Sequence, residues 1–526
     1  MSERRVWTFF VLLVLAACGG GGSSNPSVPT SPAGGAPGGG TPTAAPTKTP
    51  TPAPTKTPTP APTRTPTPTQ SPAVTVTVDG TSAGPAISED LLGASLAAWS
   101  DITQPFIESS MASTGFHLVR WPGGSASDEY HWATNSVCQG YVNPNSTFDA
   151  FAHDVFEPAH LDVAVTLNYG SNAECNAGGD PAEAAAWVAH AKAGGEHVAY
   201  WTVGNEEFGS WEYDLHASPH DPTTYANAVA TGYYPQVKAA DTSAKVGVVV
   251  GGSGYPSWDK TVLQSAKYDF VEFHYYAQAP GSESDAYLLG QGVTDFANAV
   301  SGLRTEMNGD GVAASVPIYV GELNSVYANP GKQTVSIVNG LFAGMAIAEL
   351  MKQPGVTMAT WWLAYGGCST GTNDSSSLYG WQSFGAYTLF SDGGGECGSN
   401  IAAATPFPDA RAYALLIAFA PAGSTSRSAQ LSTAAVNVRV YADTSPGGEA
   451  LLLFNLDQTA AITLGVQLQH AAKPSFNATQ TTYGKAQYDQ SQSGAWPGPS
   501  TTSLGTVGSQ FSVTLPAWSM NLVLLR

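Results

Sequence analysis

The chain has 526 residues, enough for a large domain with a smaller one beside it. Its formal net charge is −20, although only 11% of its residues are charged. Residues 1–72 contain five of the 20 basic residues and only one acidic residue, so the rest of the chain is more acidic still. Such a surface repels nucleic acid and anionic polymers and suits a neutral partner.

The first 18 residues have the order of an export signal. Arg4 and Arg5 precede an apolar run, 6–15, that is too short to span a membrane comfortably. Residues 15–18 read Leu-Ala-Ala-Cys and resemble a bacterial lipobox, in which the cysteine becomes the lipidated first residue. We therefore expect a lipoprotein signal peptide, 1–18, and an exported protein anchored through Cys18 to the bacterial cell envelope, at the outer membrane or cell surface. The alternative is an ordinary signal peptide in which Cys18 is incidental.

Residues 19–73 are mostly Gly, Ser, Pro, Thr and Ala, and the segment from Thr47 to Pro54 recurs almost unchanged from Thr55. Nothing in this composition can bury a core. Alternating prolines favour the extended polyproline II conformation. We expect a spacer that holds a folded part away from a membrane surface, which the chain would touch only through its lipid.

From about 90 to 420, short apolar runs alternate with Ala-rich helical stretches, a pattern typical of βα units. Eight runs can be counted: 91–99, 116–122, 162–169, 200–206, 245–251, 269–276, 317–324 and 358–365. Helix candidates between them include 181–193, 222–240 (with Asp221 as N-cap) and 334–352. Eight strands with intervening helices predict an α/β fold, a closed (β/α)₈ TIM barrel over residues 90–420. A doubly wound open sheet is disfavoured, because no Gly-rich phosphate loop follows the first strand.

After residue 420 the pattern changes to strands separated by polar turns: 436–442, 449–454, 461–467, 479–483, 510–515 and 520–525. This predicts a β-sandwich over residues 421–526. A lone strand, 74–78, precedes the barrel, and we expect the segment 74–89 to join that sandwich.

Without Cys18, four cysteines remain, an even number in an oxidising compartment. No pair has metal-ligand spacing, and we predict the disulfides Cys138–Cys175 and Cys368–Cys397 and no bound metal. The alternative is free buried thiols. Two long loops, 125–149 and 366–401, carry cysteines of the two predicted disulfides and would either wall off a pocket or shape a cleft.

The functional groups of such barrels lie at the C-terminal ends of the strands. Here those ends carry Arg120, Asn168, Asn205, Glu206, His274, Tyr276, Glu322, Trp361 and Trp362. Strands four and seven lie on opposite sides of a barrel mouth, so Glu206 and Glu322 should face each other. Two carboxylates about 5–5.5 Å apart are what a retaining glycosidase requires. Glu207 is the main alternative to Glu206 as the acid. Neighbouring strand residues face opposite ways, so only one of the two can serve in that role.

The order of these motifs resembles glycoside hydrolase clan A over the whole barrel. Several stretches are similar to the α-L-arabinofuranosidases of family 51: 119–124, 130–132, 168–170, 201–206, 209–211 and 274–276, as is the trailing sandwich. Around Glu322 the sequence Val-Gly-Glu-Leu-Asn-Ser is closer to families 39, 44 and 79, and Glu207-Phe208-Gly209 departs from the family 51 pattern.

The clan resemblance implies that Glu206 is the acid/base and Glu322 the nucleophile. Asn205 would bond the sugar 2-hydroxyl, and Tyr276 or His274 would orient Glu322. A second buried negative charge beside an ionised Glu322 is costly, so the pKa of Glu206 should be raised.

The remaining strand-end residues complete the expected substrate site. Arg120 would lower the pKa of Glu322 by its charge. Trp361 or Trp362 would form a stacking floor for a sugar ring, and one of the two should belong to the core. Asn168 is a candidate for substrate binding or, equally, a strand-end cap.

The resemblance predicts a retaining hydrolase of plant-type polysaccharide or oligosaccharide, with an exo-acting α-L-arabinofuranosidase as the leading hypothesis. The second hypothesis is an endo-β-glycanase of the same clan, such as a glucanase, xylanase or xyloglucanase. The third, of another class, is a non-catalytic carbohydrate-binding surface lipoprotein with a decayed barrel; it predicts the loss of a carboxylate, yet both are present. No cofactor motif is found in the sequence, and the expected partner is a neutral carbohydrate.

Overall fold

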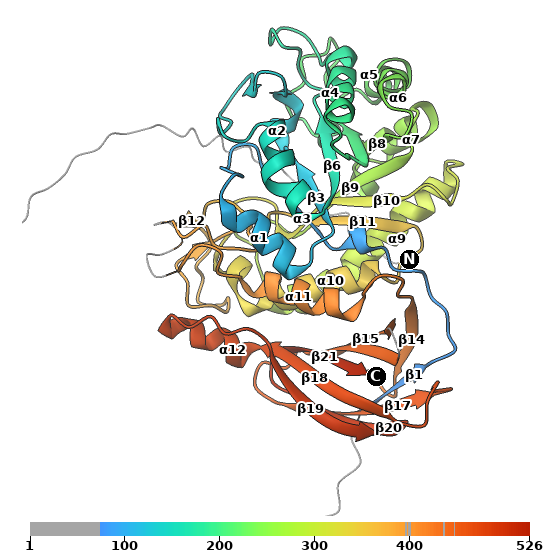
Figure 1. Cartoon of the computed structure of the whole chain (residues 1–526), viewed down its shortest axis with the longest axis vertical. Coiled ribbons are helices and arrows are strands. Elements are labelled where there is room, and N and C mark those ends of the chain that lie inside the picture. The colour runs from blue at the N-terminus through green and yellow to red at the C-terminus, as the bar shows by residue number, and fades with distance from the viewer. Residues whose placement is uncertain (1–73, 395–396, 398–400, 435–436, 446–447) are drawn as a thin grey trace, which may run out of the picture. The chain divides into compact units, whose positions relative to one another are not determined.

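The computed structural model describes residues 74–394, 397, 401–434, 437–445 and 448–526 (Figure 1). The predicted signal peptide with Cys18 and the predicted spacer lie outside these residues, as do Val436, which begins one predicted strand, and residues 395–396 and 398–400 of the second long loop. Among the described residues, no helix is both long and apolar enough to cross a membrane.

Eight parallel strands close into a barrel, which confirms the predicted fold class (Figure 1). In chain order they are β2 (Gly93–Ser95), β3 (Leu118–Trp121), β6 (Asp162–Leu167), β7 (Tyr200–Val203), β8 (Lys245–Val250), β9 (Phe270–Gln278), β10 (Ile318–Val326) and β11 (Val356–Trp361). The ring closes where Thr360 of β11 pairs with Gly93 of β2. Each strand corresponds to one predicted run, because strands buried on both faces give nearly continuous apolar segments.

The helices that cover the barrel include α1 (Pro105–Thr114), α4 (Pro181–Gly194), α5 (Pro222–Ala228), α6 (Tyr234–Ala240), α7 (Pro256–Ser265), α9 (Val293–Gly309), α10 (Ile337–Leu350) and α11 (Pro408–Phe419). Asp221 caps α5 as predicted, by accepting a 2.8 Å bond from the Thr224 N–H. The predicted helix 222–240 is in fact α5 and α6, joined by a π-helical turn at Val229–Tyr233. Pro235 has no N–H to donate to the preceding turn, which accounts for the widened ladder there.

Nine strands form one sheet in the order β19-β18-β21-β16-β15-β14-β1-β17-β20. Their bounds are β1 (Val74–Asp79), β14 (Ser426–Leu431), β15 (Val438–Ser445), β16 (Gly448–Asn455), β17 (Ile462–Gln469), β18 (Phe476–Gly484), β19 (Ser500–Val507), β20 (Gln510–Leu515) and β21 (Ser519–Leu525). The sheet folds over into a sandwich, in which the Gln480 amide of β18 donates to the Thr514 carbonyl of β20 at 2.9 Å. One apolar core fills the space between the two layers.

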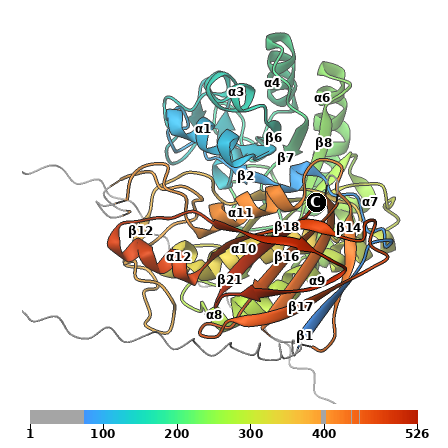
Figure 2. The ribbon, with the colours of Figure 1, turned by 60° about the horizontal axis from the view of Figure 1, so that its bottom comes forward.

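Strand β1 lies inside this sheet although it precedes the barrel in the chain. It pairs in antiparallel fashion with β14 and in parallel with β17. The small domain is therefore built from chain segments that precede and follow the barrel in the sequence (Figure 2).

One buried cluster joins the barrel to the sandwich. Phe454 of β16 and Leu522 of β21 belong to the same buried cluster as Leu341 of α10 and Tyr413 of α11. Of the 14 residues of α10, 13 are buried, as expected for a helix with no solvent face. Helices α10 and α11 therefore pack between the barrel and the sandwich (Figure 1).

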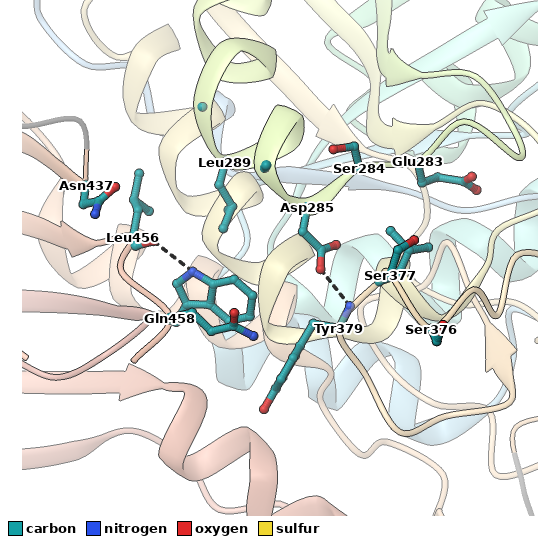
Figure 3. Close-up of a pocket in the computed structure, with 14 residues that line it drawn as sticks. Glu283, Ser284, Asp285, Leu289, Ser376, Ser377, Tyr379, Asn437, Leu456 and Gln458 are labelled. Atoms are coloured by element: carbon teal, nitrogen blue, oxygen red, sulfur yellow. Dashed lines mark hydrogen bonds between the residues drawn. The ribbon is translucent and has the colours of Figure 1, made fainter. Parts of the chain in front are cut away.

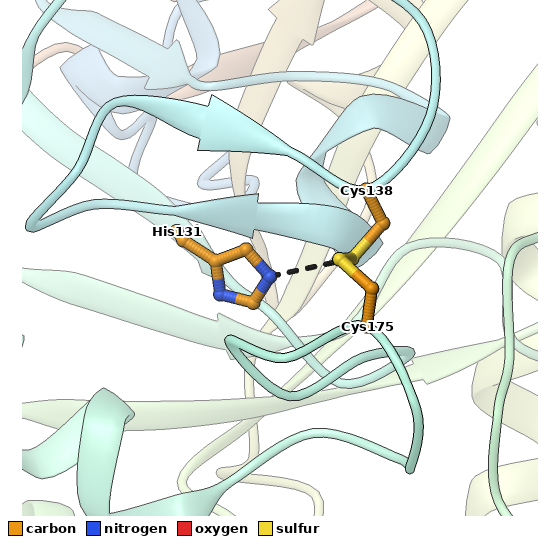
Figure 4. A group of neighbouring side chains, drawn as sticks. All are labelled: His131, Cys138 and Cys175. Atoms are coloured by element: carbon orange, nitrogen blue, oxygen red, sulfur yellow. Dashed lines mark hydrogen bonds between the residues drawn. A yellow bond between two sulfur atoms is a disulfide. The ribbon is translucent and has the colours of Figure 1, made fainter.

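Two disulfides fasten loops around the barrel mouth, and their pairing is the predicted one. Cys138 and Cys175 have their Cα atoms 5.6 Å apart and join the loop after β3 to the loop after β6, beside His131 (Figure 4). Cys368 and Cys397, with Cα atoms 5.1 Å apart, hold the loop after β11. The loop after β11 carries a two-stranded ladder of β12 (Ser369–Thr370) and β13 (Phe384–Gly385). The loop after β3 carries another, formed by β4 (Tyr130–His131) and β5 (Ser136–Val137).

Candidate active site

Two carboxylates meet over the barrel mouth. Glu206 follows β7, the fourth barrel strand, and Glu322 lies in β10, the seventh. One carboxylate oxygen of each, together with a ring nitrogen of His274, lie within 4.8 Å of one another. The side chain of Glu206 is 19% exposed and that of Glu322 is 6% exposed, so both retain access to the mouth.

The turn that presents Glu206 is sharp. Gly204 has a φ of 76°, and a Cβ there would lie 2.7 Å from the Cγ atom of Glu207. Glu206 itself has a φ of 46°, a left-handed conformation that non-glycine residues seldom adopt and that is often found at functional sites. The turn sends Glu206 to the mouth and buries Glu207 completely.

Arg120 of β3 joins three of the site's side chains. Its Nη1 atom donates to Glu322 at 2.8 Å, its Nη2 atom donates to the Asn205 amide oxygen at 2.8 Å, and its Nε atom lies 3.0 Å from Glu272. The guanidinium is buried, and burial alone would lower its pKa, but the charges of Glu272 and Glu322 raise it. Arg120 is therefore a permanent positive charge beneath the two carboxylates.

Glu322 is held as an acceptor from two sides. The Tyr276 hydroxyl donates to its Oε2 atom at 2.5 Å, and Arg120 donates to its Oε1 atom. Of the two residues expected to orient Glu322, Tyr276 makes the short contact; His274 Nδ1 is 3.8 Å away.

His274 instead contacts Glu206, with 2.9 Å between Nδ1 and Oε1. Its other nitrogen, Nε2, lies 3.0 Å from Glu272. Burial would lower the pKa of His274, but the carboxylates of Glu322, Glu206 and Glu272 raise it to about 10.

The same contact changes the expectation for Glu206. Burial would raise the pKa of this carboxyl, but the hydrogen bond and charge of His274, with the Trp211 N–H and Arg120, outweigh it and lower the pKa. The sequence argument for a raised pKa was wrong because it counted the charge of Glu322 and not the histidine between them.

Glu272 is a site residue that the sequence analysis missed. It is buried in β9, contacts Arg120 and His274, and accepts a bond from the Thr202 hydroxyl. The strand period supplies the overlooked signal: Glu272, His274 and Tyr276 are spaced two apart, so they share one face of β9.

The side-chain amide of Asn205 is held at both its oxygen and its nitrogen. Its amide oxygen accepts from Arg120, and its Nδ2 atom donates to Glu212 at 3.0 Å, which leaves one N–H for a ligand. Its backbone N–H donates to Asp128 at 2.9 Å. Burial raises the pKa of Asp128 and of Glu212 well above ordinary values, so the acids behind Asn205 favour the protonated form.

Aromatic rings flank the carboxylates. The Trp211 indole, 47% exposed, donates from Nε1 to Glu206 Oε2 at 2.8 Å. Trp362 and Trp99 stand together, with ring centroids 5.9 Å apart. A Cβ on Gly124 would come within 2.8 Å of the Trp362 ring, so this glycine makes room for the pair.

Two predicted substrate-binding residues lie away from the mouth. Trp361 is fully buried and packs against Phe342 and Tyr413 in the barrel core. Asn168 is engaged in a local turn, where its side chain accepts from the Ser171 N–H and donates to the Tyr130 carbonyl. Hydrogen bonds and ion pairs thus join Arg120, Asn205, Glu206, His274, Tyr276 and Glu322. Trp362 packs in a cluster with Tyr276, whereas Asn168 and Trp361 lie in supporting positions.

The cluster of Glu206, His274 and Glu322 has metal-ligating residue types, but its atoms are already engaged. Both ring nitrogens of His274 contact carboxylates, and Arg120 and Tyr276 occupy Glu322. A metal ligand must be a neutral imidazole with a free lone pair, so this arrangement fits a charge-compensated proton-transfer site better than a metal centre.

A separate cavity of about 810 Å³ lies between α8 (Asp285–Tyr287), the loop before β13 and the sandwich (Figure 3). Leu289, Tyr379 and Trp518 line it, and the Trp518 indole donates to the Leu456 carbonyl at 3.0 Å. None of the strand-end residues described above lines this cavity.

No protein-family model matches the chain, and no curated protein matches it. Solved structures do share its fold. A GH51 arabinofuranosidase from Xanthomonas axonopodis pv. citri aligns with a TM-score of 0.65 at 19% identity, over 86% of this chain and 99% of that one. An α-L-arabinofuranosidase from Thermotoga maritima, in complex with arabinose, aligns at 0.65 and 17%, over 86% and 100%. A family 44 xyloglucanase from Paenibacillus polymyxa aligns at 0.61 and 14%, over 86% and 99%. At these identities the likeness establishes the barrel-and-sandwich fold.

Proposed function

We propose that this protein is a retaining O-glycoside hydrolase of neutral plant-type polysaccharides or oligosaccharides, with Glu322 as nucleophile and Glu206 as acid/base. The observation that carries the proposal is the approach of the two carboxylates to within 4.8 Å, one after the fourth barrel strand and one within the seventh. Retaining glycosidases place their carboxyl groups about 5–5.5 Å apart, whereas inverting ones need about 6.5–9.5 Å to admit a water molecule.

The surroundings of each carboxylate support its role. Arg120 and Tyr276 both donate hydrogen bonds to Glu322, which hold its carboxylate in place, as the position of a nucleophile requires. Glu206 is more exposed and contacts a histidine and an indole N–H, so it is placed to exchange a proton with a bound oxygen. The remaining N–H of Asn205 suits a hydrogen bond to a sugar hydroxyl beside the reacting carbon.

Glycoside cleavage would proceed in two displacements. Glu322 attacks the anomeric carbon while the leaving oxygen takes a proton from Glu206, which forms a glycosyl ester. Water then attacks that carbon, gives its proton to Glu206 and releases Glu322. The net charge of the protein, −20, favours a neutral saccharide as substrate.

We propose α-L-arabinofuranosides as the first substrates to test, because arabinofuranosidases are among the structures that share this fold. An endo-β-glycanase is the second candidate. It is favoured by the exposed rings of Trp211 and Trp99 at the mouth, which suit a longer saccharide. Endo action would lower the viscosity of a polymer before much reducing sugar appears, and exo action would not.

Replacing the nucleophile tests the mechanism. Glu322→Ala should lower kcat on aryl glycosides by about 10⁴-fold or more, since the covalent route is lost. A 2-fluoro-substituted aryl glycoside should label Glu322 of the wild-type protein, as measured by peptide mass. Glu349→Gln, which changes a carboxylate on α10 that bonds Tyr441, is the control and should keep its activity. Activity that survives Glu322→Ala would refute the assignment.

A further inference from the structure

Glu272, His274 and Glu206 form one line of short contacts across the floor of the site. Glu272 Oε1 is 3.0 Å from His274 Nε2, and His274 Nδ1 is 2.9 Å from Glu206 Oε1. A neutral imidazole has only one N–H, so it can donate to just one of its two carboxylate neighbours. The line is satisfied only when it holds one further proton, placed between His274 Nδ1 and Glu206 Oε1.

The other end of the line cannot take up that proton readily. Glu272 accepts from the Thr202 hydroxyl and lies against Arg120 Nε, and these contacts favour its ionised form. Gly321 on the neighbouring strand leaves the room that this carboxylate needs, because a Cβ there would be 2.0 Å from Glu272 Oε1. The contacts of Glu272 fix both its position and its charge.

We infer that the proton transferred by Glu206 is stored on His274, and that Glu272 is the positioning residue that holds this imidazole as a donor to Glu206. The inference rests on the proposed function and deepens it. It assigns Glu272 a role, and it moves the resting proton from the carboxyl group to the histidine.

The proton balance closes in both displacements. In the first, the Nδ1 proton passes to Glu206 and then to the leaving oxygen, which leaves a neutral imidazole whose Nε2–H still donates to Glu272. In the second, the proton of the attacking water returns through Glu206 to Nδ1. The resting site has Glu206, Glu272 and Glu322 ionised against Arg120 and a charged His274, and the glycosyl intermediate loses one charge of each sign. The net charge of the cluster stays constant.

Removing the histidine should change how activity depends on pH. The ionisable groups that face it are Glu272 and Tyr276 from β9, Glu206 from the turn after β7, Glu322 from β10 and Arg120 from β3. In His274→Gln, Glu206 must take its proton from solvent, so the alkaline limb of kcat/KM should move down by at least about two pH units. For aryl glycosides with poor leaving groups, kcat/KM near neutral pH should fall about 100-fold, whereas 2,4-dinitrophenyl glycosides should change only a few-fold.

His131→Gln is the matched control, because His131 is another buried histidine, 3.1 Å from Glu183 and outside the site. Its alkaline limb should stay in place. Glu272→Gln should move the limb in the same direction as His274→Gln but less far, and Glu272→Asp, which keeps the charge, should restore part of the shift.

A direct measurement covers the case in which these variants fold poorly. Nitrogen-15 NMR of histidine-labelled wild-type protein, with the His274 signals identified by their loss in His274→Gln, should show both ring nitrogens protonated near pH 7.5. A neutral ring at that pH would overturn the inference, as would equal losses for good and poor leaving groups in His274→Gln. If Glu322→Ala is inactive and only these results fail, the storage role falls and the proposed function stands; if Glu322→Ala is active, the proposed function itself falls.

Discussion

Among single residues, Trp211 combines two features that are rarely found together: its indole N–H contacts the candidate acid/base, yet 47% of the residue is exposed. In the proposed mechanism Glu206 lies beside the bond that breaks, so the ring in contact with it would border the leaving group. Phe208 and Tyr255 support the ring from behind, with centroids 6.1 and 6.5 Å away. The ring is thus a preformed surface on the side where the released part of the substrate would sit.

Two substitutions separate the functions of this indole. Trp211→Ala should lower kcat/KM on an oligosaccharide about tenfold, roughly the 1.4 kcal/mol of one ring contact. A glycosyl fluoride should be almost unaffected, because its leaving group, fluoride, has no ring to stack. Trp211→Phe should keep most of the oligosaccharide activity, since it loses the N–H but keeps an aromatic ring on which a sugar can stack. Steady-state kinetics on both substrates make the comparison; equal losses in the two variants would mean that the hydrogen bond alone matters.

At the level of elements, β9 and β10 act as a pair. β9 carries Glu272, His274 and Tyr276. β10 carries Glu322 and Gly321, and the absence of a side chain at Gly321 leaves room for Glu272. Their register pairs Glu322 with His274 and Tyr319 with Glu272, with an irregularity between Val320 and Glu322. The local geometry of two neighbouring strands therefore sets most of the contacts of the site.

Gly321→Ala tests this pairing. Its Cβ would fall 2.0 Å from a Glu272 oxygen, so the variant should lose about 1–3 kcal/mol of unfolding free energy and most of its activity. Gly302→Ala on α9 meets nothing within 4 Å and should gain about 0.5–1 kcal/mol from helix propensity. Urea unfolding of both variants provides the comparison. An undiminished stability of Gly321→Ala would show that β9 can move aside.

How far the sequence predicts these elements depends on their patterning. The eight barrel strands are apolar on both faces and stand out, and their polar ends indicate the site. β19, by contrast, has no buried residue in its sequence Ser-Thr-Thr-Ser-Leu-Gly-Thr-Val, so no alternation identifies it. The pairing of His274 with Glu206 was beyond sequence reasoning, because it depends on how a left-handed turn aims one side chain across the barrel.

On the scale of the whole molecule, several carboxyl groups are buried without a cation beside them. Burial raises the pKa of Asp259 and Asp409 to about 8, and that of Asp90 and Asp443 to about 7. In the unfolded chain these groups lose their protons near pH 4. Between these limits the folded state binds more protons than the unfolded state. The contribution of these groups to the free energy of unfolding is therefore fully present below about pH 4 and is lost as pH rises through 7 to 8.

We therefore expect the free energy of unfolding to fall between pH 5 and pH 8, as measured by urea titration at each pH. Asp409→Asn, which cannot ionise, should flatten this dependence. Asp241→Asn is the control, because hydrogen bonds lower the pKa of Asp241, and its contribution disappears only in more acidic solution than this window. A stability that rises toward pH 8 would contradict the linkage.

The position of β1 has a consequence for biosynthesis. The strand at residues 74–79 finds its two neighbours only beyond residue 425, in β14 and β17. During synthesis it must wait, with both edges unsatisfied, until almost the entire chain has emerged. A message truncated after the barrel would thus yield a polypeptide in which β1 has no partner strand. Nascent molecules would need protection from pairing with one another through β1 until the last fifth of the chain has been synthesised.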